Sequence, residues 1–164
     1  MTEMLESVRP LFLAAGWRPG RRSSTAPEVS ADHPAASILI EFGGLRVGQI
    51  GRGEECATGD VVFQPLPGAD TVVRLWCELL QTRLVGVAEV HNAHAEMYVG
   101  TDGSWYQVSS VDNETSYAGR SFGAAMERLL FGRRCLPMLR PDQAKVTMYG
   151  EVFSAHDSRV YKYR

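Results

Sequence analysis

The sequence has few cysteines, no long apolar run and no basic leader, and each shortage excludes a class of protein. Its three cysteines, Cys56, Cys77 and Cys135, lie far apart without paired spacing, which indicates reduced thiols rather than a disulfide framework. No apolar run reaches the length of about 18 residues that a transmembrane helix needs. Residues 1–6 are acidic and lack the basic start and apolar core of a secretory signal. Together these shortages predict a cytoplasmic protein that does not contact a membrane.

Enzyme signatures are also missing. Gly51-Arg52-Gly53 lacks the Gly-Lys-Ser/Thr continuation of a phosphate-binding loop, and no Gly-x-Ser-x-Gly nucleophile motif occurs. His94-Ala95-Glu96 fits half of a zinc deaminase signature, but the Pro-Cys-x-x-Cys half that must follow it is absent. His91 and His94 with Glu89 and Glu96 could form another metal site, although surface histidines in a loop are the better interpretation. The sequence therefore predicts a binding protein with no catalytic residue, no metal and no cofactor.

Composition and charge describe an ordinary globular chain with a polarity along it. The 164 residues are 45% hydrophobic and 22% charged, which is enough for one domain with its own core. Residues 41–115 contain 11 acidic and 4 basic residues, whereas residues 116–164 contain 9 basic and 4 acidic ones. This polarity indicates either a solvated surface or an acidic face that meets a basic partner. Because acids are interspersed with the C-terminal arginines, direct nucleic-acid binding is a weak hypothesis.

The N-terminal third shows helical spacing twice. The first helix is expected within residues 4–15 and stops at Gly16. Pro10 lies either in the first turn of a short helix capped by Ser7 or at a kink in a longer one. A second helix is expected from near Asp32, with a proline in its first turn, to Phe42. Its end would need the left-handed conformation at one of the two glycines that follow.

Two further helices carry clear start and stop signals. One begins at Asp70 or Thr71 and places an apolar stripe along residues 72–80. The other begins after Ser121, buries one face and stops at Gly132. A stripe of this kind is typical of core packing rather than of a partner groove.

Strand-like patterns separate the helices, and polar stretches connect them. Asp102-Gly103 predicts a tight hairpin turn. Residues 51–60 are interpreted as a mobile surface loop and residues 109–119 as a polar loop. In the tail, a turn at residues 155–158 could join two strands at residues 146–153 and 159–163. The remaining expected strands are residues 45–50, 61–63, 84–88, 97–100 and 105–108.

The order of several short motifs resembles the SUKH superfamily, and most of all its third immunity-protein subgroup. The two more specific motifs are Gly16-Trp17-Arg18-Pro19-Gly20-Arg21 and Glu41-Phe42-Gly43-Gly44-Leu45. The later motifs are generic. They are His33-Pro34-Ala35-Ala36, Leu84-Val85-Gly86, Asp102-Gly103, Gly119-Arg120-Ser121-Phe122 and the stop at Gly132.

The resemblance implies an α+β fold, a single domain with a curved, mainly antiparallel sheet flanked by helices. Residues 1–132 would form the SUKH-like immunity domain. Residues 133–164, here called the C-terminal extension, would pack on the same domain and could form a β-hairpin. The resemblance assigns the motif residues a structural role. They are Gly16, Trp17, Arg21, Phe42, Gly43 and Gly44.

The resemblance also implies a function: binding and neutralising a cognate polymorphic toxin in the cytosol, without catalysis. The toxin domain could be a nuclease or a nucleotide-modifying enzyme, whose active site would be basic. The alternative is an intracellular interaction or regulatory module of the same fold with a partner that is not a toxin. The exposed carboxylates expected to meet a basic partner are Glu54, Glu55, Asp60, Asp112 and Glu114. Trp105 and Tyr117 are the expected aromatic anchors.

Overall fold

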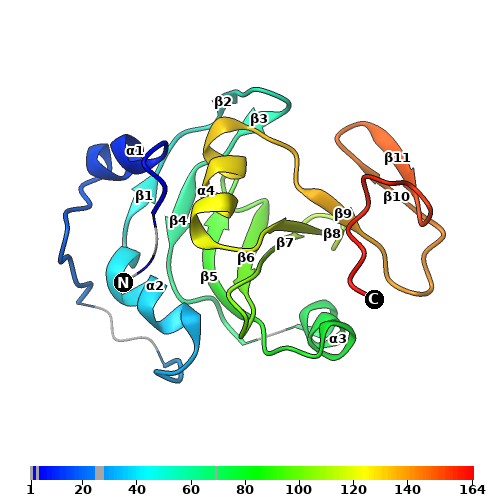
Figure 1. Ribbon diagram of the computed structural model, residues 1–164, viewed down its shortest axis with the longest axis horizontal. Coiled ribbons are helices and arrows are strands. Elements are labelled where there is room, and N and C mark those ends of the chain that lie inside the picture. Colours follow the sequence, from blue (N-terminus) through cyan, green and yellow to red (C-terminus); the bar gives the residue numbers. More distant parts are fainter. Residues whose placement is uncertain (1, 3, 25–27, 69) are drawn as a thin grey trace.

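The computed structural model describes residues 2, 4–24, 28–68 and 70–164 (Figure 1). In these residues the chain forms four helices and a sheet of seven strands, together with two small hairpins. The helices are α1 (Arg9–Ala14), α2 (Pro34–Phe42), α3 (Thr71–Leu80) and α4 (Phe122–Phe131). The predicted helical segments are therefore all present.

The main sheet is antiparallel throughout, with strand order β1-β4-β5-β6-β7-β8-β9. Its strands are β1 (Arg46–Val47), β4 (Val61–Phe63), β5 (Val85–Val90), β6 (Ala95–Val99), β7 (Trp105–Ser109), β8 (Thr115–Gly119) and β9 (Leu136–Met138). The hairpins pair β2 (Gly51–Arg52) with β3 (Ala57–Thr58), and β10 (Lys145–Met148) with β11 (Glu151–Ser154). The predicted fold class, an α+β domain with an antiparallel sheet flanked by helices, is confirmed.

Local capping explains where α3 and α4 begin and end. The Asp70 carboxylate accepts a hydrogen bond from the Val73 amide at 3.0 Å, and the Ser121 hydroxyl accepts one from the Ala124 amide at 3.3 Å. Each bond satisfies an amide that has no partner inside the helix. Gly132 ends α4 in the left-handed conformation, with φ at 67°. These three sequence-based predictions are confirmed.

The second helix starts close to the expected position, with Pro34 in its first turn and Phe42 at its end. His33 caps it, because its Nδ1 accepts a hydrogen bond from the Ala35 amide at 3.1 Å. Helix α1 is the short alternative, with Pro10 in its first turn. Ser7 does not cap it. Instead, the Ser7 hydroxyl donates a hydrogen bond to the Glu127 carboxylate of α4, which draws it away from the helix start.

Neighbouring side chains on a strand point to opposite faces of the sheet, and both faces are covered by helices. Helices α1, α2 and α4 contribute to the core on the face that includes Met97. Helix α3 and its Trp76 pack with Tyr98 and Tyr106 on the other face. The first core is centred on aromatic rings, and Phe42 stacks on Phe122 with centroids 4.6 Å apart.

The C-terminal extension adds to the far edge of the sheet, across from α1 and α2 (Figure 1). Strand β9 pairs with β8, where Pro137 lies opposite Ser116. The β10–β11 hairpin turns at Tyr149 and Gly150, both with positive φ. The chain also turns at residues 155–158, as predicted, but this turn does not join two strands. The predicted strand at residues 146–153 is instead broken by the hairpin reversal at Tyr149 and Gly150, where glycine accepts a positive φ without strain.

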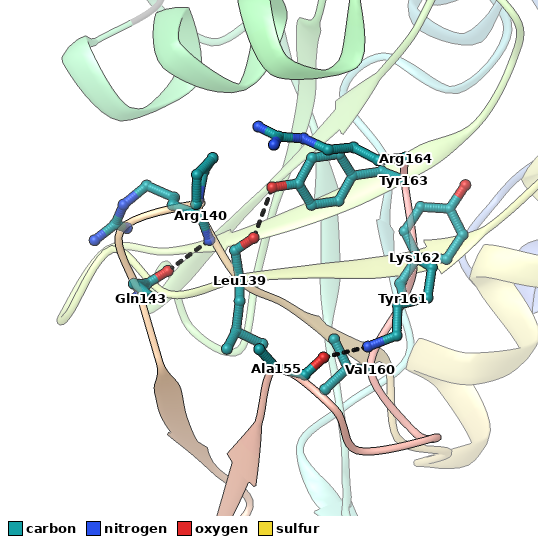
Figure 2. A pocket seen from close by; sticks show the side chains of 10 residues that line it. Leu139, Arg140, Gln143, Ala155, Val160, Tyr161, Lys162, Tyr163 and Arg164 are labelled. Atoms are coloured by element: carbon teal, nitrogen blue, oxygen red, sulfur yellow. Dashed lines mark hydrogen bonds between the residues drawn. The ribbon is translucent and has the colours of Figure 1, made fainter.

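Residues 159–163 form no strand, and the tail lies on the α3 face of the sheet. The Tyr161 amide donates to the Pro137 carbonyl at 2.9 Å, so the tail follows β9. The Tyr163 ring meets Trp76 edge to face at 5.2 Å between centroids. Figure 2 shows the Tyr163 hydroxyl donating to the Leu139 carbonyl, at 2.7 Å. Two tyrosines thus hold the end of the described chain in place.

Candidate partner-binding surface

The two specific motifs meet at one corner of the fold, where α1 ends and α2 passes into β1. The Arg21 guanidinium donates to the Glu41 carbonyl at 2.6 Å and to the Gly43 carbonyl at 2.8 Å. The Trp17 indole N–H donates to the Glu41 carboxylate at 3.2 Å. Trp17 is buried with Phe42, and Gly16 has a positive φ at the end of α1. Arg21 and Trp17 thus hold the segment after α1 against the end of α2, so these motif residues stabilise the fold.

The glycine pair at this corner has two separate physical requirements. Gly44 has φ at +83°, a conformation that is strained for any residue with a Cβ. Gly43 has an ordinary φ of −47°, but a Cβ there would lie 2.4 Å from the Leu39 carbonyl oxygen. Alanine would therefore strain the backbone at position 44 and clash with the end of α2 at position 43.

Residues 51–58 form the β2–β3 hairpin, so the prediction of a mobile loop at 51–60 is wrong. The Glu54 amide donates to the Phe131 carbonyl at 2.9 Å, and the amides of Glu55 and Cys56 donate to the Gly132 carbonyl at 2.8 and 2.9 Å. The last carbonyls of a helix lack partners within the helix, and here the hairpin supplies them. The hairpin is thereby fixed on the end of α4.

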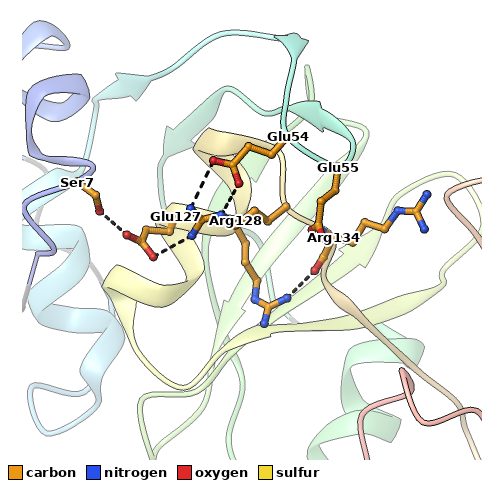
Figure 3. Close-up of polar contacts among 7 residues, drawn as sticks. Ser7, Glu54, Glu55, Glu127, Arg128 and Arg134 are labelled. Carbon is orange, nitrogen blue, oxygen red and sulfur yellow. Dashed lines mark hydrogen bonds and ion pairs between the residues drawn. The ribbon is translucent and has the colours of Figure 1, made fainter.

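Glu54 and Glu55 are exposed as predicted, but both have partners within the chain (Figure 3). The Arg133 guanidinium binds Glu54 at 2.7 Å and Glu127 at 3.2 Å. The hydrogen bond from Arg133 lowers the pKa of Glu54 below its usual value. Glu55 accepts from the Arg134 amide at 2.8 Å. Their charge is thus partly compensated, which weakens the case that they steer a basic partner.

Asp60, predicted to be an exposed contact, is 2% exposed, so this prediction is wrong. Its carboxylate binds the Arg46 guanidinium at 2.7 Å and accepts from the Asn92 amide at 2.8 Å. Burial alone would raise the pKa of Asp60, but the Asn92 amide and Arg46 outweigh it and hold that pKa below its usual value. Asp60 therefore ties the β5–β6 turn to the edge of the sheet.

Trp105, predicted to be an aromatic anchor, is also buried and only 1% exposed. It begins β7 on the face covered by α4, and its ring meets Phe122 edge to face at 5.7 Å between centroids. Trp105 and Tyr106 are neighbours on β7, so their rings point to opposite faces of the sheet and belong to opposite clusters. Trp105 belongs to the fold and cannot contact a partner.

The predicted polar loop at residues 109–119 is correct only in its first half, because residues 115–119 form β8. The β7–β8 turn that remains keeps Asp112 exposed and Glu114 half-exposed. Asp112 accepts from the Glu114 amide at 3.1 Å, and Asn113 between them has φ at 60°. Val111, which the sequence analysis passed over, is 76% exposed at the tip. Glu114 lies 3.4 Å from the Gln143 side-chain nitrogen. The acidic turn is therefore in contact with the C-terminal extension.

Tyr117 is half-buried, because the chain's own tail covers its ring. Tyr161 stacks on it almost in parallel, with centroids 3.9 Å apart and planes 4° apart. On its other side Tyr117 meets Tyr106 edge to face at 5.7 Å. Both neighbours are internal, so Tyr117 offers a partner little of its ring while the tail is in place.

Glu89 and Glu96 form a pair that sequence reasoning considered only as metal ligands. They lie directly opposite each other on β5 and β6, and the Tyr98 hydroxyl donates to Glu96 at 2.6 Å. His91, Asn92 and Ala93 form the turn between these strands with three consecutive positive φ values. In the described ranges, no three His, Cys, Asp or Glu side chains converge as a metal site would require. The strand register, which a single sequence does not reveal, brings the two carboxylates together.

The comparisons with known proteins point to one family. The sequence profile of the SUKH-3 immunity protein family matches residues 4–132, and the match ends where Gly132 closes α4. No curated protein and no solved structure matches the chain. Of the helices in the described ranges, none has the length and apolar character to span a bilayer. Because the profile covers well over half of the sequence, the resemblance to the third SUKH subgroup is confirmed, and the chain belongs to the SUKH-3 immunity protein family.

Proposed function

We propose that this chain is the immunity partner of a polymorphic toxin, and that it acts in the cytoplasm by binding the toxin domain and blocking it. The family match over residues 4–132 carries the proposal. An immunity protein of this kind needs no reaction of its own, because covering the active site of a toxin is sufficient. We propose that residues 4–132 supply the immunity fold and that the extension belongs to the same functional unit.

The toxin is proposed to act on nucleic acid or on nucleotides, and its active site would then carry positive charge. The β7–β8 turn suits such a site, because Val111, Asp112 and Glu114 project there from a fixed hairpin. Opposite charge would speed the encounter, and an exposed valine among carboxylates would supply apolar contact. Glu54 and Glu55 lie elsewhere, on the end of α4, and are proposed only as peripheral contacts.

The test requires the partner toxin domain, which is to be sought first in the gene next to the one that encodes this chain. Cells that express the toxin domain should stop growing, and co-expression of this chain should restore growth. The purified proteins should form a complex in solution. If the chain neither protects nor binds while it remains folded, the immunity proposal fails, and a regulatory module with another partner becomes the better hypothesis.

The position of the surface is tested by association kinetics. Replacing Asp112 by Asn and Glu114 by Gln removes the charge and keeps an acceptor at each position. At low salt the association rate should fall roughly threefold or more, and its salt dependence should weaken. Glu78→Gln is the control, because Glu78 is an exposed carboxylate of α3 outside the turn. Equal rates for the turn variant and the control would exclude the turn as the contact.

A further inference from the structure

The C-terminal extension contains a small pocket between the 139–143 turn and the tail (Figure 2). Its volume is about 210 Å³, and its apolar walls include Leu139, Val160 and Tyr161. The turn is closed by the Gln143 side-chain oxygen, which accepts from the Arg140 amide at 2.9 Å. The Lys162 ammonium donates to the Ala155 carbonyl, and Tyr163 holds the Leu139 carbonyl. Both walls are therefore fixed before any ligand arrives.

Positive charge surrounds this pocket and exceeds the negative charge nearby. Arg140, Lys162 and Arg164 all line it. The acid closest in sequence, Asp142, pairs with Arg140 at 3.4 Å and is 74% exposed at its side chain. Among the ion pairs of the described residues, none joins a carboxylate to Lys162 or Arg164. Residues 133–164 carry 7 basic and 3 acidic residues in all, a net charge of +4.

The other two acids of the extension form their ion pairs with Arg134 and Arg159, although Asp157 also lies near enough to Lys162 for that charge to help lower the pKa of Asp157. Glu151 binds Arg134 at 2.9 Å and Arg159 at 2.7 Å, and Asp157 binds Arg159 at 2.9 Å. The acids of the extension therefore compensate the cations around the pocket only in part. A fixed pocket with apolar walls and an excess of positive charge is suited to a group that is both small and anionic.

We propose that this pocket receives the carboxylate of an aspartate or glutamate side chain of the partner protein. The proposal rests on the proposed function, since the partner is the toxin domain. A volume of about 210 Å³ admits a side chain but lies below the range of roughly 300–1,000 Å³ that is typical of small-molecule pockets. The Lys162 ammonium, which already donates to the Ala155 carbonyl at the pocket, would meet the carboxylate, and Arg164 would add positive charge from the opposite end (Figure 2). The apolar walls would contact the methylene groups of the incoming side chain.

The neighbouring acidic turn argues for a protein and against a polyanion as the occupant. Glu114 touches Gln143 at 3.4 Å, so the acidic turn and the basic pocket lie on either side of one short contact. A nucleic acid that reached the pocket would be repelled by Asp112 and Glu114. A protein can place a carboxylate in the pocket and a basic group on the turn. Such an arrangement of opposite charges would fix a single docking orientation.

A titration tests the pocket without the toxin. The probe is N-acetylglutamate amide, and amide shifts of residues 139–143 and 160–164 are followed by NMR. We expect saturable shifts with a dissociation constant in the millimolar range, and none with the neutral N-acetylglutamine amide. The double variant Lys162→Gln with Arg164→Gln should bind at least about fivefold more weakly, because it loses one charge-assisted contact and a second positive charge at the pocket. Arg22→Gln with Arg52→Gln, at exposed sites near the other edge of the sheet, should bind like wild type.

The outcomes separate this inference from the immunity proposal. Saturation at the pocket that is lost in the double variant supports the inference. Absence of shifts, equal binding by both variants, or tighter binding of inorganic phosphate than of the glutamate probe would overturn it. With the toxin domain in hand, the double variant should dissociate faster than wild type. If wild type binds the toxin and the double variant binds equally well, the pocket inference fails and the immunity proposal stands.

Discussion

Residues 4–132 and the C-terminal extension are held in place by different interactions. The first region packs buried rings around Phe42, which meets Phe12 at 5.2 Å and Phe122 at 4.6 Å between centroids. The extension has a small core of its own, and ion pairs at its surface run from Arg134 through Glu151 to Arg159. Exposed ion pairs contribute little to stability, whereas buried rings contribute much.

The comparison indicates where the chain can change without unfolding. A substitution among the rings must keep volume and shape, because a close-packed core relaxes poorly. A substitution among the exposed charges of the extension alters the surface and leaves the packing intact. An immunity protein must follow changes in its toxin, so a partner contact built from such charges would be easier to adjust than one built from the core.

The largest expected effect is in the aromatic core. Phe42 is fully buried, so Phe42→Ala should lower the free energy of unfolding by about 3–5 kcal/mol. Denaturant unfolding followed by circular dichroism measures this change. Val152→Ala in the extension is the control, because Val152 is 59% exposed on β11 and its loss should stay within about 0.5 kcal/mol. Equal midpoints for the two variants would remove the contrast between the regions.

A smaller effect, of opposite sign, is expected in the turn between β5 and β6. Ala93 has φ at 64°, a left-handed conformation that is strained in residues with a Cβ. Ala93→Gly should therefore stabilise the chain by about 1 kcal/mol, as measured by thermal or denaturant unfolding. Ala14→Gly, the same substitution at an exposed helical position in α1, should destabilise by up to about 1 kcal/mol. A loss of stability in both variants would mean that the turn is not strained at Ala93.

The smallest effect concerns acid and the charges of the extension. Hydrogen bonds from Arg159 lower the pKa of Asp157 from 3.8 to about 2, and hydrogen bonds from Arg134 and Arg159 lower the pKa of Glu151. A carboxylate with a lowered folded pKa stabilises above its unfolded pKa and loses that effect as the pH falls through the folded value. The ties of the hairpin should therefore weaken as the pH falls from about 4.5 to about 2.

Carboxyl-carbon NMR titration of Asp157 measures this shift directly, and amide exchange of residues 145–160 reports the loosening. The Glu151→Gln variant should loosen less on acidification, because it has lost one titrating group. A titration midpoint for Asp157 near its ordinary value of 3.8 would show that Arg159 does not hold it.

Local signals in the sequence predicted most of the helices and their ends. Asp70, Ser121 and Gly132 act on amides or carbonyls within a few residues, so their effect can be read from the sequence. The reversal at Tyr149 and Gly150 has a similar signal, a glycine between two short alternating runs, but the polar stretch at residues 155–158 carries a turn signal as well. Local signals thus locate turns and helix ends, but they do not show which of two turns joins a pair of strands.

Contacts between distant residues explain the wrong predictions about the surface. Asp60 accepts from an amide 32 residues later, and no local pattern announces that contact. The 51–58 hairpin binds the last carbonyls of α4, and Glu55 accepts from an amide 79 residues away. Tyr117 is covered by Tyr161, which belongs to the extension outside the family match. Exposure depends on the whole fold, so the sequence around these residues does not show that they have partners within the chain.

Pro137 in β9 decides how the outer edge of the sheet can behave. Proline has no amide hydrogen, and the carbonyl of Pro137 already accepts from Tyr161. An incoming strand would find neither a donor nor a free acceptor at the centre of this edge. Copies of the chain therefore cannot join sheet to sheet there, which protects against aggregation at high expression. For the same reason this edge is poorly suited to capture the proposed partner by strand addition.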